Sequence, residues 1–381
     1  MKKISPSFVI LILILPFIMP EYLVKISFIS QLVKFWKIGA GSFSIIYLCK
    51  KKKTNKILLL LTLFYLIMIL SAFFHGYDIL DYLNFISFLW IISFLTETKE
   101  KYSNFCDVYK KIMTIIVSIN LLTMIMYPNG LYVTSSYEFN WFLGYKNTLI
   151  RRILPFITII LLEKRNKFNF YEKYGIVISV LSIILSKSFN GYVGITVFFS
   201  SFYVINKYKK ISSKLTFSKT FISYILLDII MLSTNILAKF NDFIVNVLDK
   251  NGSMLGREAI WNKTITLISH SPFVGYGNIE SSFYNMTFKI SHPHNLLLYY
   301  LMLGGIASII VLLISLKNVD RSIRMKNNSN CILICFYISM FSMGFLESLI
   351  GATFLIPFMS MTYNINVGGY YDRNLYPVSN K

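Results

Sequence analysis

The chain is built from a succession of apolar segments, each close to twenty residues long and separated by short polar stretches. A segment of roughly 20 apolar residues is long enough to cross a bilayer as a helix. Only helices or closed barrels satisfy their backbone hydrogen bonds there, and runs that are apolar on every face favour helices. Charged residues make up 14% of the 381 positions, whereas about a quarter is usual in soluble domains. We therefore predict an all-α integral membrane protein.

About twelve transmembrane helices are expected, within one polytopic domain over residues 1–381. The first apolar run is followed by no small-x-small cleavage site, so we expect it to remain as a span and not to act as a cleaved signal peptide. The predicted spans lie near residues 5–24, 28–49, 57–74, 79–95, 112–127, 148–162, 174–188, 191–206, 219–238, 295–316, 331–349 and 351–366.

The basic residues predict the orientation. With both termini in the cytoplasm, about 26 of the 38 Lys and Arg fall on the cytoplasmic side, as the positive-inside rule requires. The formal net charge of +21 is then explained by topology and anionic lipid headgroups, and it requires no nucleic-acid partner. The four cysteines fall near cytoplasmic ends of spans, where disulfides do not persist. No nucleotide-binding motif is present, and we expect no cofactor.

Two predicted outer loops are longer than the others, at residues 128–147 and 239–294. Long loops in compact folds are often functional. The second contains a predicted amphipathic helix near 255–270, which places Ile260, Thr264, Leu267 and Ile268 near one face. Ser271-Pro272 ends this helix, and a glycine-rich turn follows. We expect the helix to lie over the outer membrane face.

Three of the four histidines, His270, His292 and His294, lie in this second loop. His292 and His294 belong to His-Pro-His-Asn, which ends at Asn295 and opens the apolar run that continues to Gly304-Gly305. Polar groups at the mouth of a membrane helix suggest a functional site. A zinc site made of the three histidines is an alternative, but no acidic or cysteine ligand with suitable spacing accompanies them. We expect no metal.

Arg257 lies in the first turn of the predicted loop helix. A guanidinium beside a helix N-terminus suits a phosphate group, because the helix dipole also favours an anion there. The alternative is an interfacial arginine that pairs with Glu258 or stacks on Trp261.

Other charged groups are predicted near the outer membrane face. Arg151 and Arg152 open the sixth span, and Lys187 ends the seventh. Each is a candidate for the same anion, although a lipid-headgroup anchor is the alternative role. Glu347 lies near the outer end of the eleventh span, where a buried carboxylate normally has a partner. Either it lies near His294, or it makes a helix-packing hydrogen bond.

Short motifs in these segments resemble those of the O-antigen ligase and Wzy polymerase superfamily. They are Gly-Arg-x-x-x-Trp at 256–261, Ser-Pro-Phe-x-Gly-x-Gly at 271–277, His-Asn ahead of the glycine pair, and Phe-Leu-Gly-x-Lys-Asn at 142–147. The resemblance covers roughly residues 140–360. It implies a polymerase or ligase architecture similar to the GT-C glycosyltransferases, with an extracytoplasmic loop that carries the amphipathic helix.

The resemblance also implies glycosyl transfer on the outer face of the bacterial cytoplasmic membrane, with a polyprenyl diphosphate-linked donor and no required metal. His294 is then the catalytic base, because a histidine near neutrality can accept the acceptor proton, and Glu347 is its catalytic partner. Four cations are expected to bind the diphosphate: Arg257, Arg151, Arg152 and Lys187. We expect His292, Asn295 and Trp261 to line the substrate.

Polymerisation of lipid-linked repeat units is the favoured reaction. The Ile, Lys, Asn and Phe bias indicates an AT-rich bacterial genome, and the lysine-rich loops resemble those of Gram-positive capsule polymerases. The expected partners are lipid-linked oligosaccharide donor and acceptor, the bilayer and a chain-length regulator. An O-antigen ligase-like transferase and a repeat-unit flippase remain alternatives, although a transporter typically has two related halves, and no matching halves are found here.

Overall fold

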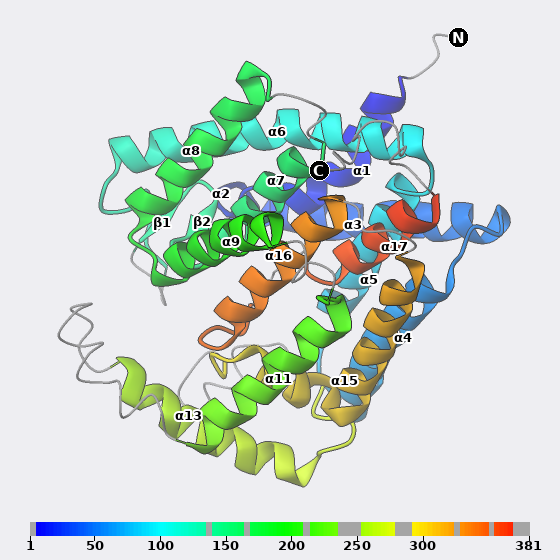
Figure 1. Cartoon of the computed structure of the whole chain (residues 1–381), viewed down its shortest axis with the longest axis vertical. Helices are drawn as coiled ribbons and strands as arrows, with labels where there is room; N and C mark the ends of the chain where they lie inside the picture. The colour runs from blue at the N-terminus through cyan, green and yellow to red at the C-terminus, as the bar shows by residue number, and fades with distance from the viewer. Residues whose placement is uncertain are drawn as a thin grey trace.

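The computed structural model describes residues 5–134, 139–163, 168–208, 214–234, 253–278, 292–323, 328–349 and 354–368. These residues form fourteen helices and one two-stranded hairpin (Figure 1). The helices are α1 (Pro6–Ile18), α2 (Glu21–Val24), α3 (Ser27–Lys50), α4 (Lys56–Phe74), α5 (Leu80–Leu95), α6 (Lys99–Met126), α7 (Ile150–Leu162), α8 (Phe170–Ser186), α9 (Phe189–Lys207), α11 (Phe217–Ser233), α13 (Ser253–His270), α15 (Leu296–Ser322), α16 (Asn328–Gly344) and α17 (Pro357–Gly368). In the hairpin, β1 (Asn140–Trp141) pairs antiparallel with β2 (Gly144–Tyr145).

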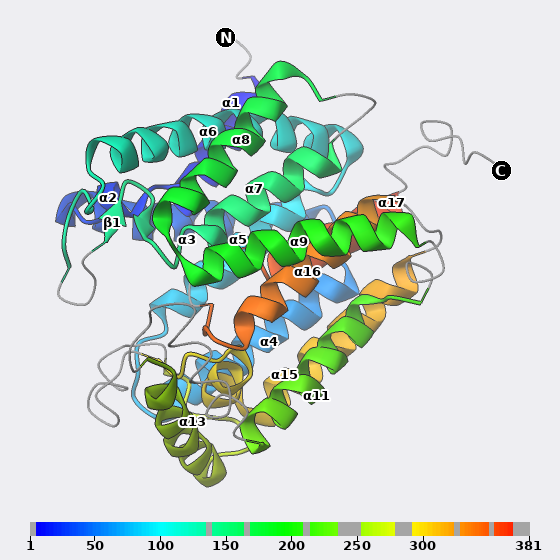
Figure 2. The ribbon, with the colours of Figure 1, turned by 60° about the vertical axis from the view of Figure 1, so that its left-hand side comes forward.

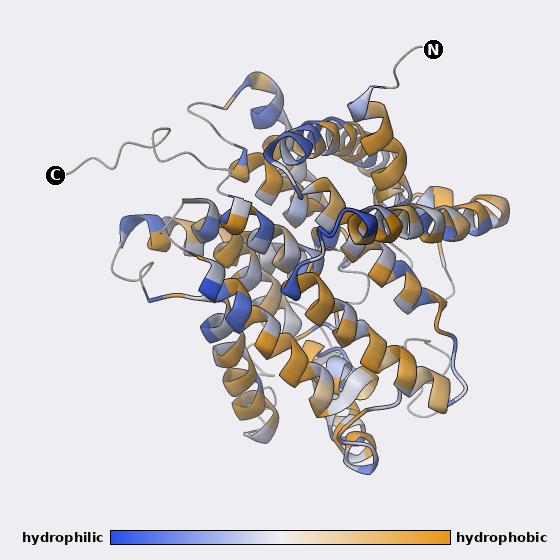
Figure 3. Ribbon diagram, turned by 90° about the vertical axis from the view of Figure 1, so that its right-hand side faces the viewer, coloured by the Kyte–Doolittle hydropathy of each residue, from blue (hydrophilic) through white to orange (hydrophobic). Residues whose placement is uncertain are grey.

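Four of the described helices, α3, α4, α6 and α15, are long and apolar enough to cross a membrane, and α1, α5 and α16 are shorter apolar helices. Large apolar side chains also point outward, as Leu59, Leu63 and Leu66 do on α4. Figure 3 shows hydrophobic residues along most of the helices. An outward apolar face suits lipid, and the chain is a multi-pass membrane protein. The number of twelve spans stays a prediction.

Most helix starts coincide with capping side chains. Asn55, Thr98, Ser188 and Thr216 each accept a hydrogen bond from a backbone N–H in the first turn, and Asn169 forms a capping box with Glu172. Such caps satisfy N–H groups that have no partner within the helix. They explain why α4, α9 and α11 begin within a few residues of the predicted spans.

Several helix boundaries differ from the predicted spans, and three of these differences bear on the site or have a clear local reason. The first helix ends at Ile18 rather than near 24, because Pro20 cannot continue it. Helix α6 begins at Lys99, well before 112, because Tyr102, Phe105 and Tyr109 give its polar first half a buried face. Helix α16 ends at Gly344, so Glu347 lies in the segment after the helix and not within a span.

Helix α15 is broken at Gly305, whose φ of 58° is left-handed. The turn after α13 fills the break with backbone hydrogen bonds. Ile306 N–H donates to Pro272 O at 2.8 Å, and Gly277 N–H donates to Leu303 O at 3.0 Å. A Cβ on Gly305 would overlap the Phe273 backbone, so glycine is required there. The Ser-Pro-Phe-x-Gly-x-Gly turn and the glycine pair are therefore two halves of one junction.

This junction fixes one end of α13 against α15. Figures 1 and 2 show α13 at one edge of the molecule, beside the ends of α11 and α15. The other edge is occupied by α1, α6 and α8 (Figure 2). The start of α15 and the junction are therefore the points through which α13 is held on the helical body.

Candidate active site

The His-Pro-His-Asn segment lies directly before α15 and is held by its last residue. Asn295 is the N-cap of α15, where its Oδ1 accepts the N–H of Leu298 at 2.9 Å. Its Nδ2 donates to Asp228 Oδ1 on α11 at 2.8 Å, and Asn295 is fully buried. The preceding residue, His294, has a φ of 50°, a conformation that non-glycine residues adopt at a cost. The fixed cap therefore determines where the histidine backbone lies.

Helix α13 supports the same segment from the other side. The Trp261 indole N–H donates to Pro293 O at 3.0 Å, and Trp261 and Thr264 are both buried. The face of α13 predicted from Ile260, Thr264 and Leu267 is the one turned toward the body, since Asn262, Lys263 and Thr266 are exposed. Trp261 and Asn295 therefore enclose the histidine segment between them.

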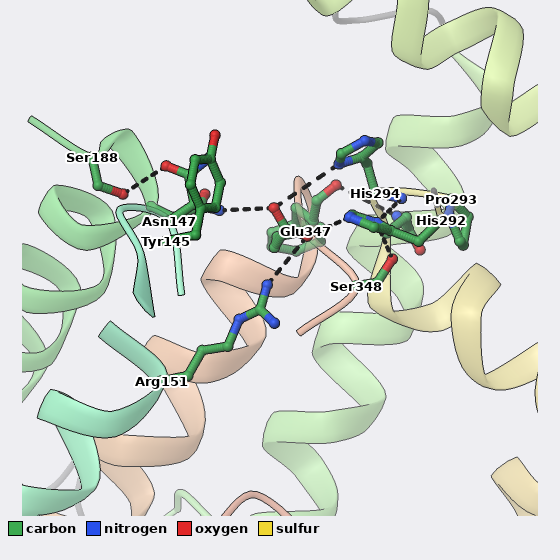
Figure 4. A network of polar contacts seen from close by, with 12 residues as sticks. Tyr145, Asn147, Arg151, Ser188, His292, Pro293, His294, Glu347 and Ser348 are labelled. Atoms are coloured by element: carbon green, nitrogen blue, oxygen red, sulfur yellow. Dashed lines mark hydrogen bonds and ion pairs between the residues drawn. The ribbon is translucent and has the colours of Figure 1, made fainter. Parts of the chain in front are cut away.

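Glu347 is the centre of the polar cluster (Figure 4). Its Oε1 lies 3.3 Å from an Arg151 guanidinium nitrogen and 3.4 Å from His292 Nε2. Its Oε2 accepts a hydrogen bond from Asn190 Nδ2 at 3.3 Å and lies 3.9 Å from His294 Nδ1. The cluster is formed by four parts of the chain. These are α7, α9, the segment after α16 and the segment before α15. Residues far apart in the chain thus meet around one carboxylate.

The hydrogen bonds assign different roles to the two histidines. His292 Nδ1 faces the N–H of His294 at 3.2 Å and the Ser348 hydroxyl at 3.1 Å. Because the backbone N–H can only donate, Nδ1 accepts and carries no proton, and the Nε2–H of His292 points to Glu347. His294 turns its Nδ1 toward Glu347, which leaves its Nε2 as the nitrogen available to another molecule. His294 is also the most accessible of the group, with 28% of its side chain exposed, against 9% for His292 and 6% for Glu347.

The charged groups of the cluster carry one more positive charge than negative charge. Burial lowers the pKa of His292 to about 3, although Glu347 opposes the shift, so this ring is neutral. Burial raises the pKa of Glu347, but the adjacent His294 ring and the charge of Arg151 outweigh it and hold the pKa well below the usual range. Burial lowers the pKa of Arg257, and the charge of Glu347 raises it. Two guanidinium groups thus act on one carboxylate, an arrangement suited to a further anion.

Arg257 approaches the cluster from α13, where Glu347 and Tyr145 are the groups whose charges act on it. One expectation about it is wrong. Helix α13 begins at Ser253, so Arg257 lies beyond the first turn, where the helix dipole contributes little. The attraction of Arg257 for an anion therefore comes from its own charge and from burial.

Two of the four predicted diphosphate ligands lie away from Glu347. The Arg152 guanidinium donates to Met19 O at 2.8 Å and lies 3.4 Å from Glu21 Oε1. Lys187 is the left-handed C-cap of α8, and its side chain is exposed. Its neighbours in the same turn do reach inward: Asn190 contacts Glu347, and the Ser188 hydroxyl donates to Asn147 Oδ1 at 2.9 Å.

Sequence reasoning passed over Asn190 and Ser348, which contact Glu347 and His292. Ser348 directly follows Glu347, and Asn190 lies three residues after Lys187, within Ser-Lys-Ser-Phe-Asn-Gly. Buried polar side chains normally have hydrogen-bond partners. Uncharged polar residues within a few positions of a charged candidate could therefore have been predicted to belong to the same site.

The three residues His292, His294 and Glu347 could also approach a metal ion, since one ligand atom from each lies within 4.8 Å of the others. His270 is not in this group, and its Nδ1 lies 2.8 Å from Thr266 O in its own helix. A cation at this point would lie beside Arg151, which already occupies Glu347 Oε1. The donor set therefore fits a metal poorly, because a like charge is adjacent.

A comparison with protein families shows which part of the chain is similar to a known family. Residues 174–313 match a family model described as O-antigen ligase. The chain carries an O-antigen ligase domain. No curated protein matches the chain. The ligase domain contains α8, α9, α11, α13 and the His-Pro-His-Asn segment, together with the break in α15. Arg151 and Glu347 lie outside it, so flanking segments complete the cluster.

Proposed function

We propose that this protein is a bacterial polysaccharide polymerase. It joins oligosaccharide repeat units carried on polyprenyl diphosphate, on the outer face of the cytoplasmic membrane, and both of its termini face the cytoplasm. The observation that carries the proposal is the placement of His294, which is more accessible than Arg151, His292 and Glu347, in a cluster that also includes Arg257. Glycosyl transfer from a lipid diphosphate needs a general base for the acceptor hydroxyl and positive charge to stabilise the leaving diphosphate.

The bond changes balance without a cofactor. The acceptor hydroxyl oxygen forms a bond to the anomeric carbon of the donor, and the bond from that carbon to the diphosphate oxygen breaks. The diphosphate leaves with the electron pair, and the hydroxyl proton passes to His294 Nε2. We assign this base role to His294 because its Nδ1 faces Glu347, which orients the ring and stabilises the imidazolium that forms.

The guanidinium groups act on the leaving group. Arg257 and Arg151 supply fixed positive charge in a partly buried site, where it stabilises a developing anion more strongly than in water. Arg152 and Lys187 contact other groups or solvent, so we propose a lesser role for them. His292, Asn295 and Trp261 are buried, and we assign them to positioning of His294 rather than to a substrate surface.

A reconstitution experiment tests the reaction class. The purified protein in liposomes receives a lipid-linked repeat unit together with a metal chelator, and the products are separated by glycan length. A ladder of longer lipid-linked glycans, with release of polyprenyl diphosphate, is expected. Transfer only to a different acceptor lipid would indicate a ligase, and movement of the lipid across the bilayer without elongation would indicate a flippase. Loss of elongation with the chelator would indicate a metal-dependent site.

A further inference from the structure

A separate cavity of about 220 Å³ lies between α1, α2, α3, α5 and the start of α7. Its volume is that of roughly seven molecules of liquid water at about 30 Å³ each, which is the size of one sugar ring. Its lining comes from residues 16–152, whereas the ligase domain begins at 174. The cavity is therefore built by the part of the chain that precedes this domain.

The charges around the cavity are balanced. Lys37 and Asp81 bring one charge of each sign, and Arg152 pairs with Glu21 at 3.4 Å. The remaining described cation, Arg151, faces Glu347. A diphosphate would require an excess of positive charge, whereas balanced donors and acceptors suit a ligand whose hydroxyls both donate and accept.

One polar group in the lining lacks a partner. Asn84 is 9% exposed, and its Oδ1 accepts no hydrogen bond from the described residues. Buried amide oxygens normally have a donor, and a ligand hydroxyl would provide one. Phe17 and Phe85 also line the cavity and offer apolar surface to the C–H face of a sugar ring. Pockets with an apolar wall and a few directed polar groups are typical of small-molecule sites.

We propose that this cavity binds one uncharged sugar ring of the lipid-linked oligosaccharide and thereby selects the repeat unit. The inference rests on the proposed function. Arg151 lines the cavity and also contacts Glu347, so a sugar bound here lies one side chain from the histidine cluster. The next sugar along the glycan then reaches His294. Selection of the sugar and transfer of the glycan are thus performed by neighbouring sets of residues that share Arg151.

Binding by the full-length protein in detergent tests the cavity directly. The probes are the free oligosaccharide released by mild acid from the host's own lipid-linked repeat unit, and inorganic diphosphate. Lys37→Met and Asn84→Leu each remove a polar group from a different helix, so misfolding of one leaves the other informative. Lys34→Met is the matched control, because Lys34 is exposed on α3 and lies outside the lining. Thermal melting confirms folding of each variant.

Both cavity variants are expected to weaken oligosaccharide binding at least about 10-fold, which corresponds to about 1.4 kcal/mol, with diphosphate binding unchanged. Wild-type affinity for the oligosaccharide in both variants would overturn the proposal. Weakened binding of diphosphate alone would overturn it as well, by making the cavity an anion site. If the cavity variants lose sugar affinity but the wild type never elongates its substrate, the cavity stands and the polymerase proposal fails.

Discussion

Two histidines separated by a single proline have opposite environments. His292 is enclosed and neutral, and its Nδ1 receives the backbone N–H of His294. His294 is more accessible and faces Glu347 across 3.9 Å. A buried ring with a depressed pKa is a poor proton acceptor near neutral pH. The pair is therefore one positioning histidine and one reactive histidine, and mutations in the two should have different consequences.

Arg257→Ala is expected to abolish polymer, and Arg257→Lys to retain little, because a single ammonium does not reproduce the forked contact of a guanidinium with a diphosphate. Glycan length and yield are measured beside protein abundance. Lys263→Ala is the control, since Lys263 is exposed on the same helix. Normal polymer from Arg257→Ala would reduce this arginine to an interfacial anchor.

At the scale of elements, the geometry of the site depends on how α13 is attached to the segments before and within α15. Its N-terminal half contacts the histidine segment through Trp261, and its C-terminal turn enters the break in α15. Backbone groups left unpaired by the break are satisfied by this turn, as buried backbone groups must be. The position of Arg257 relative to His294 is therefore fixed at both ends of one helix.

Gly305→Ala tests this attachment. A left-handed φ and the overlap with Phe273 should destabilise the junction by roughly 1–3 kcal/mol. Faster hydrogen exchange of the Tyr276 and Gly277 amides, with reduced elongation, is the expected result. Gly39→Ala is the control, because nothing lies within 4 Å of its added Cβ. Unchanged exchange in Gly305→Ala would show that the turn does not depend on the break.

Sequence patterns anticipated the elements better than their contacts. Apolar runs located most of the helices. The His-Pro-His-Asn motif selected His294, and a carboxylate near the end of an apolar run selected Glu347, and the fold brings the two together. The mutual pairing of the glycine pair with the Ser-Pro-Phe-x-Gly-x-Gly turn was not foreseen, because backbone pairing between distant segments has no side-chain signature. The cavity was missed for a similar reason. Lys37, Asp81 and Asn84 lie in separate segments, and nothing in their spacing indicates that they share a space.

At the scale of the whole molecule, the site lies where the ligase domain meets its flanking segments. Residues 174–313 include His292, His294 and Arg257, whereas Arg151 and Glu347 come from outside them. An alternating path through the membrane would bring the start of α7, the end of α16 and the start of α15 to one face. The function therefore requires a definite topology.

Thiol labelling tests that topology. With the native cysteines replaced by serine, cysteines are introduced at Lys263 on α13 and at Lys317 near the end of α15, both exposed positions. A membrane-impermeant reagent applied to intact cells is expected to label only position 263, because the basic bias places α13 outside. Both positions should react after lysis. Labelling of 317 alone in intact cells would reverse the orientation.

The most direct test of the account is the rate of glycan elongation by purified wild type, His294→Ala and His292→Ala on a lipid-linked repeat unit. Loss of the general base in His294→Ala is expected to lower the rate by about 10² to 10⁴, which turns a polymer ladder into single repeats. A milder loss is expected for His292→Ala, and none for His270→Ala, whose exposed ring lies outside the cluster. Elongation at the wild-type rate by folded His294→Ala would contradict the account.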